Sequence, residues 1–153
     1  MDVVTHSMAG LLIGGTAARK KDNLYAVLLT AALASALIDV LDVWLYLVDV
    51  ELYRRYHRVY THTLYGAPFF ALLGALPAWL WVKGRWLFLY LVSLVSILVH
   101  LGMDVLCDWP LLLFYPFSDR DFALYWVTYS NIPLLIILTV LSLGVIYYRY
   151  NRE

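Results

Sequence analysis

The stretch "LYAVLLTAALASALIDVLDVWLYLV", residues 24 to 48, decides the fold class of this chain. It is long enough to cross a bilayer, because a spanning helix needs about 20 mostly apolar residues. It also carries two acids, Asp39 and Asp42. Ionisable groups inside a span are costly and usually functional. The stretch therefore predicts a membrane helix that contributes to a functional site.

Other apolar segments are predicted to join this helix in the bilayer: 3–18, 64–82, 86–106 and 132–148. Hydrophobic residues make up 63% of the 153 residues, whereas soluble domains have about half. We predict an all-α fold, a polytopic membrane helical bundle with about five transmembrane helices. A chain of this length is expected to form a single domain, residues 1–153.

Basic residues gather in three places: the turn 19–22, the turn 83–85, and the tail that holds Arg149 and Arg152. Alternation of five helices places these three on one side of the membrane. The N-terminus and the connections 49–61 and 109–131 lie on the other side. The positive-inside rule then predicts a multi-pass protein of the cell (inner or plasma) membrane, with its C-terminus cytoplasmic and its N-terminus outside. The formal net charge of zero gives no support for a nucleic-acid partner.

The ionisable residues of the predicted spans fall at one membrane level. At a rise of 1.5 Å per residue, Asp39 lies about 22 Å from the basic end of its helix, and Asp104 about 27 Å along its own. Both acids are therefore near the outer end. His6 follows the outer N-terminus, and His57 and His62 belong to the outer connection. The basic turns alone determine the predicted topology. Because the ionisable residues nevertheless fall at one membrane level, they are expected to form one shared site.

Spacing also places polar residues in pairs on single helix faces. The pairs are Asp2 with His6, Asp39 with Asp42, and His100 with Asp104. Imidazole and carboxylate groups converging from several helices form metal sites in bundles. The mixture favours zinc, with manganese or iron as alternatives. So many ligands exceed one tetrahedral shell, so we predict two or three ions bridged by Asp39 or Asp104. In the structural alternative, such pairs only tie helices together, and Asp2 only stabilises a helix N-terminus.

A Thr-His motif occurs twice, in "THSMAG" at 5–10 and in "THTLYG" at 61–66. We predict that Thr5 and Thr61 are the N-caps of the helices that follow, with each histidine at the first helical position. The glycine that ends each motif would allow close packing one turn later. The motifs are thus expected to aim His6 and His62 at the shared site.

The motifs "THS", "IDVLD", "HRVYTHT", "HLGMD" and "PFSDRDFAL" occur in this order along nearly the whole chain. Their combination resembles the YdjM-like family of membrane-bound, metal-dependent hydrolases, which is distantly similar to zinc-dependent phospholipase C and related nucleases. The resemblance implies these metal ligands: His6, Asp39, His57, His62, His100 and Asp104. Asp2 is a seventh candidate from its spacing to His6. The family usually has Pro-Asp-x-Asp where this chain has Ile38-Asp39-Val40-Leu41-Asp42, so the second acid is displaced by one residue.

The expected function is that of a membrane-embedded phosphoesterase, a zinc hydrolase acting on a lipid phosphate or phosphodiester at headgroup depth. A bound metal lowers the pKa of a water molecule that attacks phosphorus, and Asp42 is the expected proton acceptor. Arg58 and Arg120 are expected to bind phosphate oxygens. Two alternatives remain open. One is a metal or proton transporter using the same ligands, although such sites usually lie at the midplane. The other is a b-type haem protein. The oligomeric state is not predicted.

Overall fold

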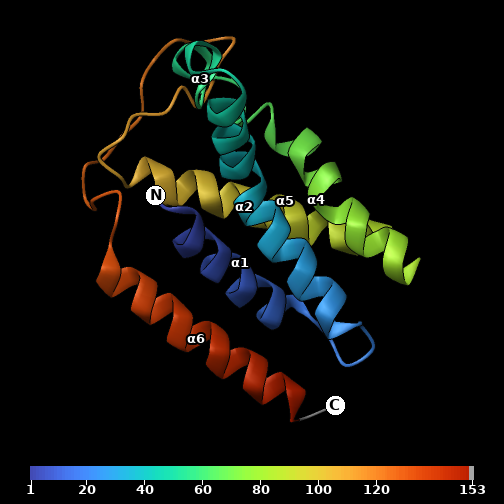
Figure 1. Ribbon diagram of the computed structural model, residues 1–153. Coiled ribbons are helices and arrows are strands. Elements are labelled where there is room, and N and C mark those ends of the chain that lie inside the picture. The colour runs from blue at the N-terminus through green and yellow to red at the C-terminus, as the bar shows by residue number, and fades with distance from the viewer. Residues whose placement is uncertain (152–153) are drawn as a thin grey trace.

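A computed structural model describes residues 1–151 of the chain and contains six α-helices and no strand in that range. The helices are α1 (Val3–Ala17), α2 (Leu24–Val48), α3 (Val50–Tyr56), α4 (Ala67–Val82), α5 (Trp86–Val105) and α6 (Ile132–Tyr150) (Figure 1). Helices α2, α5 and α6 are long and apolar enough to cross a membrane, and α1 and α4 are shorter apolar helices. The predicted all-α membrane bundle is confirmed. Only the short helix α3 was not predicted.

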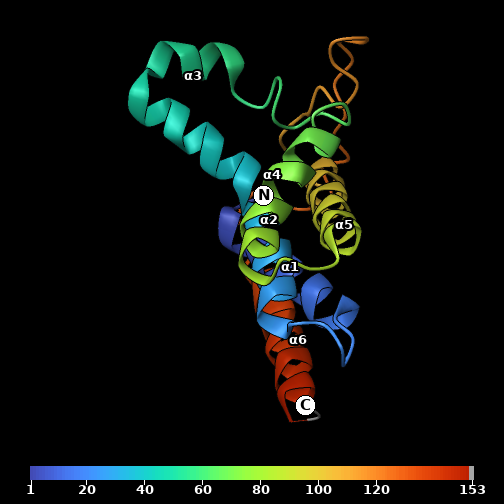
Figure 2. The same ribbon diagram turned by 90° about the vertical axis from the view of Figure 1, so that its right-hand side faces the viewer.

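Asparagine and aspartate side chains set the ends of α2. The Asn23 side chain accepts a hydrogen bond from the Ala26 amide at 3.1 Å and begins the helix. The helix ends at Asp49, whose carboxylate accepts hydrogen bonds from the amides of Glu51 and Leu52 and so begins α3. Because one residue ends α2 and caps α3, the chain turns sharply, and α3 leaves the direction of α2 (Figure 2).

Small residues bring α1 and α2 close together. A Cβ atom added at Gly10 would lie 2.5 Å from the carbonyl oxygen of Ala31 and 2.6 Å from the hydroxyl of Ser35. Gly14, one turn later on the same face, approaches α2 at Leu28. Close backbone approach through small residues is the usual way in which helices associate in lipid. It holds His6, one turn before Gly10, against the half of α2 that carries Asp39.

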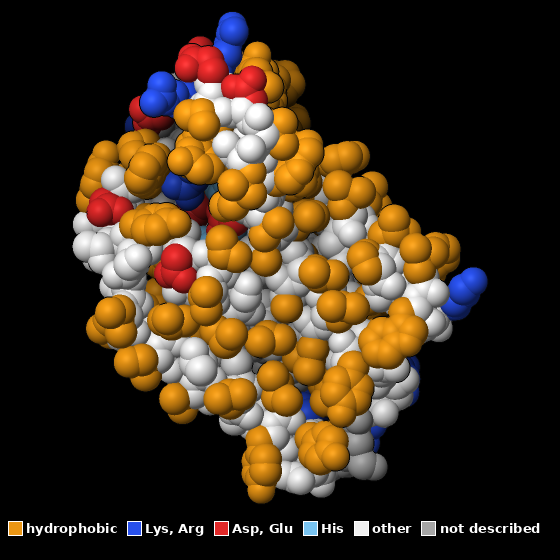
Figure 3. Space-filling view, viewed as in Figure 1, with side chains coloured by type: hydrophobic (Ala, Val, Ile, Leu, Met, Phe, Trp, Pro, Cys, Tyr) orange, Lys and Arg blue, Asp and Glu red, His pale blue; other side chains and the backbone are white. Residues whose placement is uncertain are grey.

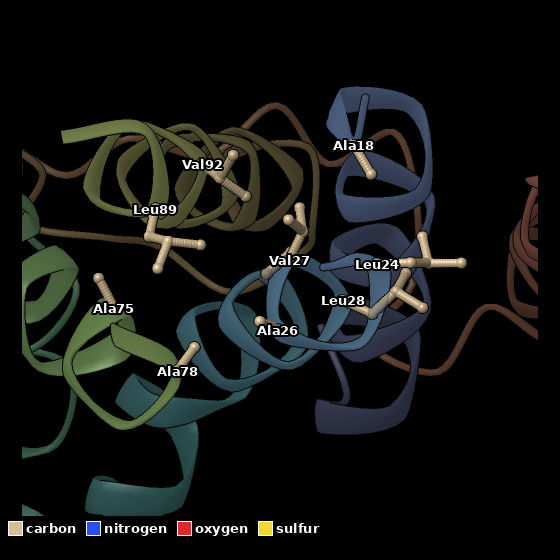
Figure 4. Close-up of a cluster of buried hydrophobic side chains, with 10 residues drawn as sticks. Ala18, Leu24, Ala26, Val27, Leu28, Ala75, Ala78, Leu89 and Val92 are labelled. Carbon is tan, nitrogen blue, oxygen red and sulfur yellow. The ribbon is translucent and has the colours of Figure 1, made fainter. Parts of the chain in front are cut away.

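One cluster of buried apolar side chains is formed by residues of α2, α4 and α5 and by Ala18, which follows α1 (Figure 4). Its fully buried members are mostly alanine, valine and leucine: Ala18, Leu24, Ala26, Val27, Leu28, Ala31, Ala75, Ala78, Leu89 and Val92. The alanines let the helices approach, and the larger side chains fill the remaining space. This packing gives α2 and α5 fixed relative positions, on which the polar site at their other ends depends.

The three basic connections lie together at one end of the bundle. Arg85 at the start of α5 forms an ion pair with Asp22 in the α1–α2 turn. Arg149 near the end of α6 donates a hydrogen bond to the carbonyl of Gly15. The expected placement of these connections on one side is therefore confirmed, although Arg152 lies outside the described residues. The N-terminus, α3 and the connection after α5 lie at the opposite end (Figures 1 and 2).

Candidate metal centre

Five ionisable side chains meet at the end of the bundle that holds the N-terminus. They come from α1, α2, α5 and the connection between α3 and α4: His6, Asp39, His62, His100 and Asp104. The side chains of the three histidines and of Asp104 have no exposed area, whereas that of Asp39 is 13% exposed. The structure thus brings together residues that are 98 positions apart in the sequence.

Four of these residues have the spacing that one metal ion requires. Ligand atoms of Asp39, His62, His100 and Asp104 all lie within 4.8 Å of one another. The Nε2 atom of His62 is 3.1 Å from Asp39 Oδ1 and 3.5 Å from Asp104 Oδ2. The Nε2 atom of His100 is 3.7 Å and 3.5 Å from the same two oxygens. Tetrahedral zinc, with bonds of about 2.0–2.2 Å, separates its ligand atoms by about 3.3–3.6 Å. The four residues could therefore hold one metal ion.

The hydrogen bonding of His100 leaves its inner nitrogen free for a metal. Its Nδ1 lies 2.7 Å from the carbonyl oxygen of Ser35, which can only accept, so Nδ1 carries the proton. In the neutral ring, Nε2 then presents a lone pair towards the carboxylates of Asp39 and Asp104. This buried nitrogen has no hydrogen-bond partner. A lone pair facing two carboxylates is unfavourable unless a cation lies between them.

A similar arrangement fixes the ring of His62. The hydroxyl of Thr61 donates to Asp42 Oδ1 at 3.0 Å, which leaves it to accept from His62 Nδ1 at 2.8 Å. His62 Nε2 is therefore the unprotonated nitrogen, and it points at Asp39 and Asp104. Burial, reinforced by the positive charge of Arg58, lowers the pKa of His62 well below its ordinary value. The ring is thus neutral, which is the form that binds metals.

His6 contacts the other oxygens of the same two carboxylates. Its Nε2 is 3.0 Å from Asp104 Oδ1 and 4.0 Å from Asp39 Oδ2. The His6 ring stacks on that of His100 with centroids 3.5 Å apart. Its Nδ1 and the Oδ2 of Asp39 are buried without hydrogen-bond partners. Each carboxylate thus has one oxygen towards His62 and His100 and the other towards His6.

Positive groups of the chain itself also contact Asp104. The guanidinium of Arg58 pairs with Oδ2, and the amino group of Met1 pairs with Oδ1. Arg58 is 7% exposed and has a left-handed backbone with φ of 61°. Its amide donates to Asp42 Oδ2 at 3.0 Å, which holds that conformation. Two positive groups of the chain therefore already balance carboxylate charge in the cluster.

Two predicted site residues lie beside the cluster. His57 Nδ1 is 3.0 Å from Asp42 Oδ2, and the His57 side chain is 25% exposed. Asp42 is 4% exposed and accepts from Thr61 and from the amide of Arg58. Asp42 thus holds the connection that carries His57 and His62, and neither Asp42 nor His57 belongs to the four-residue metal group.

The other two predicted residues lie farther away. Asp2 is the N-cap of α1 and accepts from the amide and the hydroxyl of Thr5 at 2.9 Å and 2.6 Å. Arg120 is exposed and lies over the ring of Phe122. Neither residue belongs to the metal group, and the cavity beside the cluster is lined by other residues.

The predicted N-caps were wrong. Asp2, not Thr5, caps α1, and Gly66 precedes α4 without a capping side chain. Thr5 lies inside α1, where its hydroxyl bonds to the capping carboxylate. Thr61 instead bonds to the ring of its own neighbour, His62. The threonines of the two Thr-His motifs therefore have different hydrogen-bond partners, although the two motifs have similar sequences.

A cavity of about 120 Å³ adjoins the cluster on its Asp39 side. It is lined by Met1, Val3, Asp39, Asp42, Val43, Tyr53, His57, Arg58, Trp109 and Tyr129. Figure 3 shows acidic and basic side chains at the bottom of a hollow in this face, bordered by hydrophobic ones. Tyr53, Trp109 and Tyr129 were not predicted, because aromatic residues in connections carry no pattern that separates a cavity wall from a membrane-interface anchor.

The sequence pattern of the YdjM inner membrane protein family matches residues 1–153, the whole chain. The chain belongs to this family. Membership agrees with the resemblance inferred from the Thr-His, Asp and His-Asp motifs, and with the inner-membrane location expected from the apolar helices. No curated protein and no solved structure matches the chain.

Proposed function

We propose that this YdjM family member is a metal-dependent hydrolase that cleaves phosphate esters of membrane lipids. The observation that carries the proposal is the unpartnered Nε2 of His100, buried and facing the carboxylates of Asp39 and Asp104 beside His62. Such an arrangement is stable with a cation and unfavourable without one. A hydrolase further needs access and a group that binds the substrate, and the adjoining cavity and Arg58 provide both.

Zinc suits the ligand set best, because neutral imidazole and carboxylate are its usual partners in tetrahedral sites. We assign one ion to Asp39, His62, His100 and Asp104. A second ion would be held by His6 together with Asp39 and Asp104. When bound, the ions would lower the pKa of a water molecule and neutralise the charge of phosphate oxygens.

The residues of the cavity then have separate roles. Arg58 lines the cavity and pairs with Asp104. When an ion takes over that carboxylate, its guanidinium would be released to bind two phosphate oxygens. His57 is partly exposed to the cavity and lies 3.0 Å from Asp42. We assign His57 the transfer of a proton between water and the leaving alcohol, with Asp42 orienting its ring.

Position in the membrane also favours hydrolysis over transport. The cluster lies at the end of the bundle opposite to the basic connections, whereas transporter sites lie near the midplane. With the basic connections in the cytoplasm, the site lies on the extracytoplasmic side at headgroup depth. A lipid phosphate would reach it without leaving the bilayer.

The test is hydrolysis by the purified protein in detergent, with its metal content measured in parallel. We expect release of phosphate or of a phosphorylated headgroup from lipids that carry a phosphomonoester or a phosphodiester. Chelation should abolish release and zinc should restore it. His62→Ala should be inactive and depleted of metal, and Asp119→Asn, an exposed acid outside the cluster, should resemble wild type. Equal rates with and without chelator, or in His62→Ala, would refute the proposal.

A further inference from the structure

Access to the cluster is restricted to one direction. Of the residues that surround the predicted ions, only Asp39 has an exposed side chain, at 13%, and it faces the cavity. The cavity of about 120 Å³ has room for a few water molecules, each of which occupies about 30 Å³ in the liquid. It can therefore hold a small polar headgroup such as a phosphate, whereas the hydrocarbon part of a lipid must lie outside it.

The walls of the cavity mouth belong to lipid-facing helices. Val3 on α1 and Val43 on α2 line the cavity, and Val43 is 52% exposed. Tyr53, Trp109 and Tyr129 complete the wall, and aromatic residues of this kind concentrate at membrane interfaces. The cavity thus has apolar and aromatic walls beside its charged residues, and such walls suit an amphiphile at the membrane interface.

An apolar strip continues from this mouth along the bundle. Helix α1 packs against both α2 and α6, but α2 and α6 share no contact within the described residues. At about 100° per residue, Val4 lies on the sector of α1 between its two neighbours, and Leu11, which is partly buried against the apolar core, lies on the same sector. Val43 and Ala36 lie on the adjoining sector of α2. We call these four residues, Val4, Leu11, Ala36 and Val43, the lateral strip; Val4 is 54% exposed.

We propose that the substrate enters sideways from the bilayer, with its phosphate ester in the cavity and a hydrocarbon chain along the lateral strip. This inference rests on the proposed function and adds the route of entry and the surface along which the hydrocarbon chain of the substrate lies. Val43 belongs to both the strip and the cavity lining and is 52% exposed, and this continuity supports a hydrocarbon chain as the occupant. In the reaction, the oxygen of water bonds to phosphorus and the bond from phosphorus to the alcohol oxygen breaks. One proton of the water ends on the released alcohol.

The experiment compares butyl and hexadecyl phosphate in lipid nanodiscs with wild type, Val4→Trp and Val95→Trp. Val4 lies on the strip outside the cavity lining, and Val95 on α5 is similarly exposed, at 48%. The measured quantity is the ratio of kcat/KM for hexadecyl phosphate to kcat/KM for butyl phosphate. Because binding of a remote chain contributes to transition-state stabilisation, Val4→Trp should lower this ratio about tenfold. Val95→Trp should leave it unchanged, which controls for partition of the long chain into the nanodisc.

A second measurement does not depend on turnover. Hexadecylphosphonate, which cannot be hydrolysed, should raise the melting temperature of the wild-type protein more than butylphosphonate does, and Val4→Trp should remove this difference. An unchanged ratio and an unchanged melting difference in Val4→Trp would overturn lateral entry while leaving the hydrolase proposal intact. Absence of hydrolysis of any phosphate ester would overturn the hydrolase proposal itself, and lateral entry of a substrate with it.

Discussion

Thr61 should control metal affinity although it is not a ligand. Its hydroxyl accepts a hydrogen bond from His62 Nδ1 at 2.8 Å and donates one to Asp42 Oδ1 at 3.0 Å. Thr61→Val keeps nearly the same shape and removes both bonds. The imidazole of His62 then loses the group that fixes its tautomer and its orientation. We therefore expect weaker metal binding with little change in the fold.

The expected magnitude follows from the geometry of this contact. Loss of a partner that orients a ligating histidine usually lowers metal affinity about 10- to 100-fold, or about 1.4–2.7 kcal/mol. The upper part of this range applies here for two reasons. His62 is fully buried, and the carboxylate of Asp42 is 4% exposed, so water has little access to replace the hydroxyl. The second oxygen of Asp42 already accepts from the amide of Arg58 and cannot compensate.

The assay is competition for zinc between the purified protein and a chromogenic chelator. Thr61→Ser, which keeps the hydroxyl, should bind zinc nearly as tightly as wild type. Thr5→Val is the matched control, because Thr5 occupies the same place in the other Thr-His motif but bonds to Asp2 instead of to His6. Zinc affinity within threefold of wild type in Thr61→Val, or an equal loss in Thr5→Val, would refute this reasoning.

Three further predictions concern packing, stoichiometry and topology. Gly10→Val should destabilise the bundle by about 1–3 kcal/mol, since its Cβ would meet Ala31 at 2.5 Å; Gly144→Val, with open space around the glycine, is the control in thermal melts. His6→Ala should lower the bound zinc from about two ions per chain to about one, because the group around His62 stays complete; two retained ions by elemental analysis would contradict the assignment. A cysteine introduced at Asp119 should react with a membrane-impermeant thiol reagent added to whole cells, and protection until lysis would reverse the orientation.

The spans and the level of the site could be predicted because both follow from distance along a helix. A rise of 1.5 Å per residue and the alternation of basic turns were enough to place Asp39 and Asp104 at one end. The structure confirms the fold class and brings His6, His62 and His100 to the same two acids. Helical periodicity accounts for the positions of His6, Asp39, His100 and Asp104, whereas His62 lies in the connection between α3 and α4.

Residues outside the helices were harder to predict because tertiary contacts determine their geometry. The left-handed conformation of Arg58 depends on the carboxylate of Asp42, sixteen positions earlier in the chain. The role of Thr61 depends on the same carboxylate. Helix α3 has only seven residues, and an amphipathic pattern cannot identify so short a helix. Its N-cap at Asp49 was therefore not predicted. The N-cap prediction for Thr5 was wrong because Asp2, three positions earlier, is the better capping residue there.

The spacing of Asp39 and Asp42 on α2 explains how His62 is held in place although it lies in an irregular connection. Residues three apart lie on one face of a helix, whereas residues two apart lie on nearly opposite faces. Asp39 therefore points into the cluster, while Asp42, one turn farther out, faces the connection and binds Thr61 and the amide of Arg58. The helix that provides one ligand thus also holds the segment that provides His62. If Asp42 were one residue earlier, as in the usual family pattern, it would face away from this connection. The displacement of the second acid is consistent with a role for Asp42 in positioning His62 rather than in binding metal.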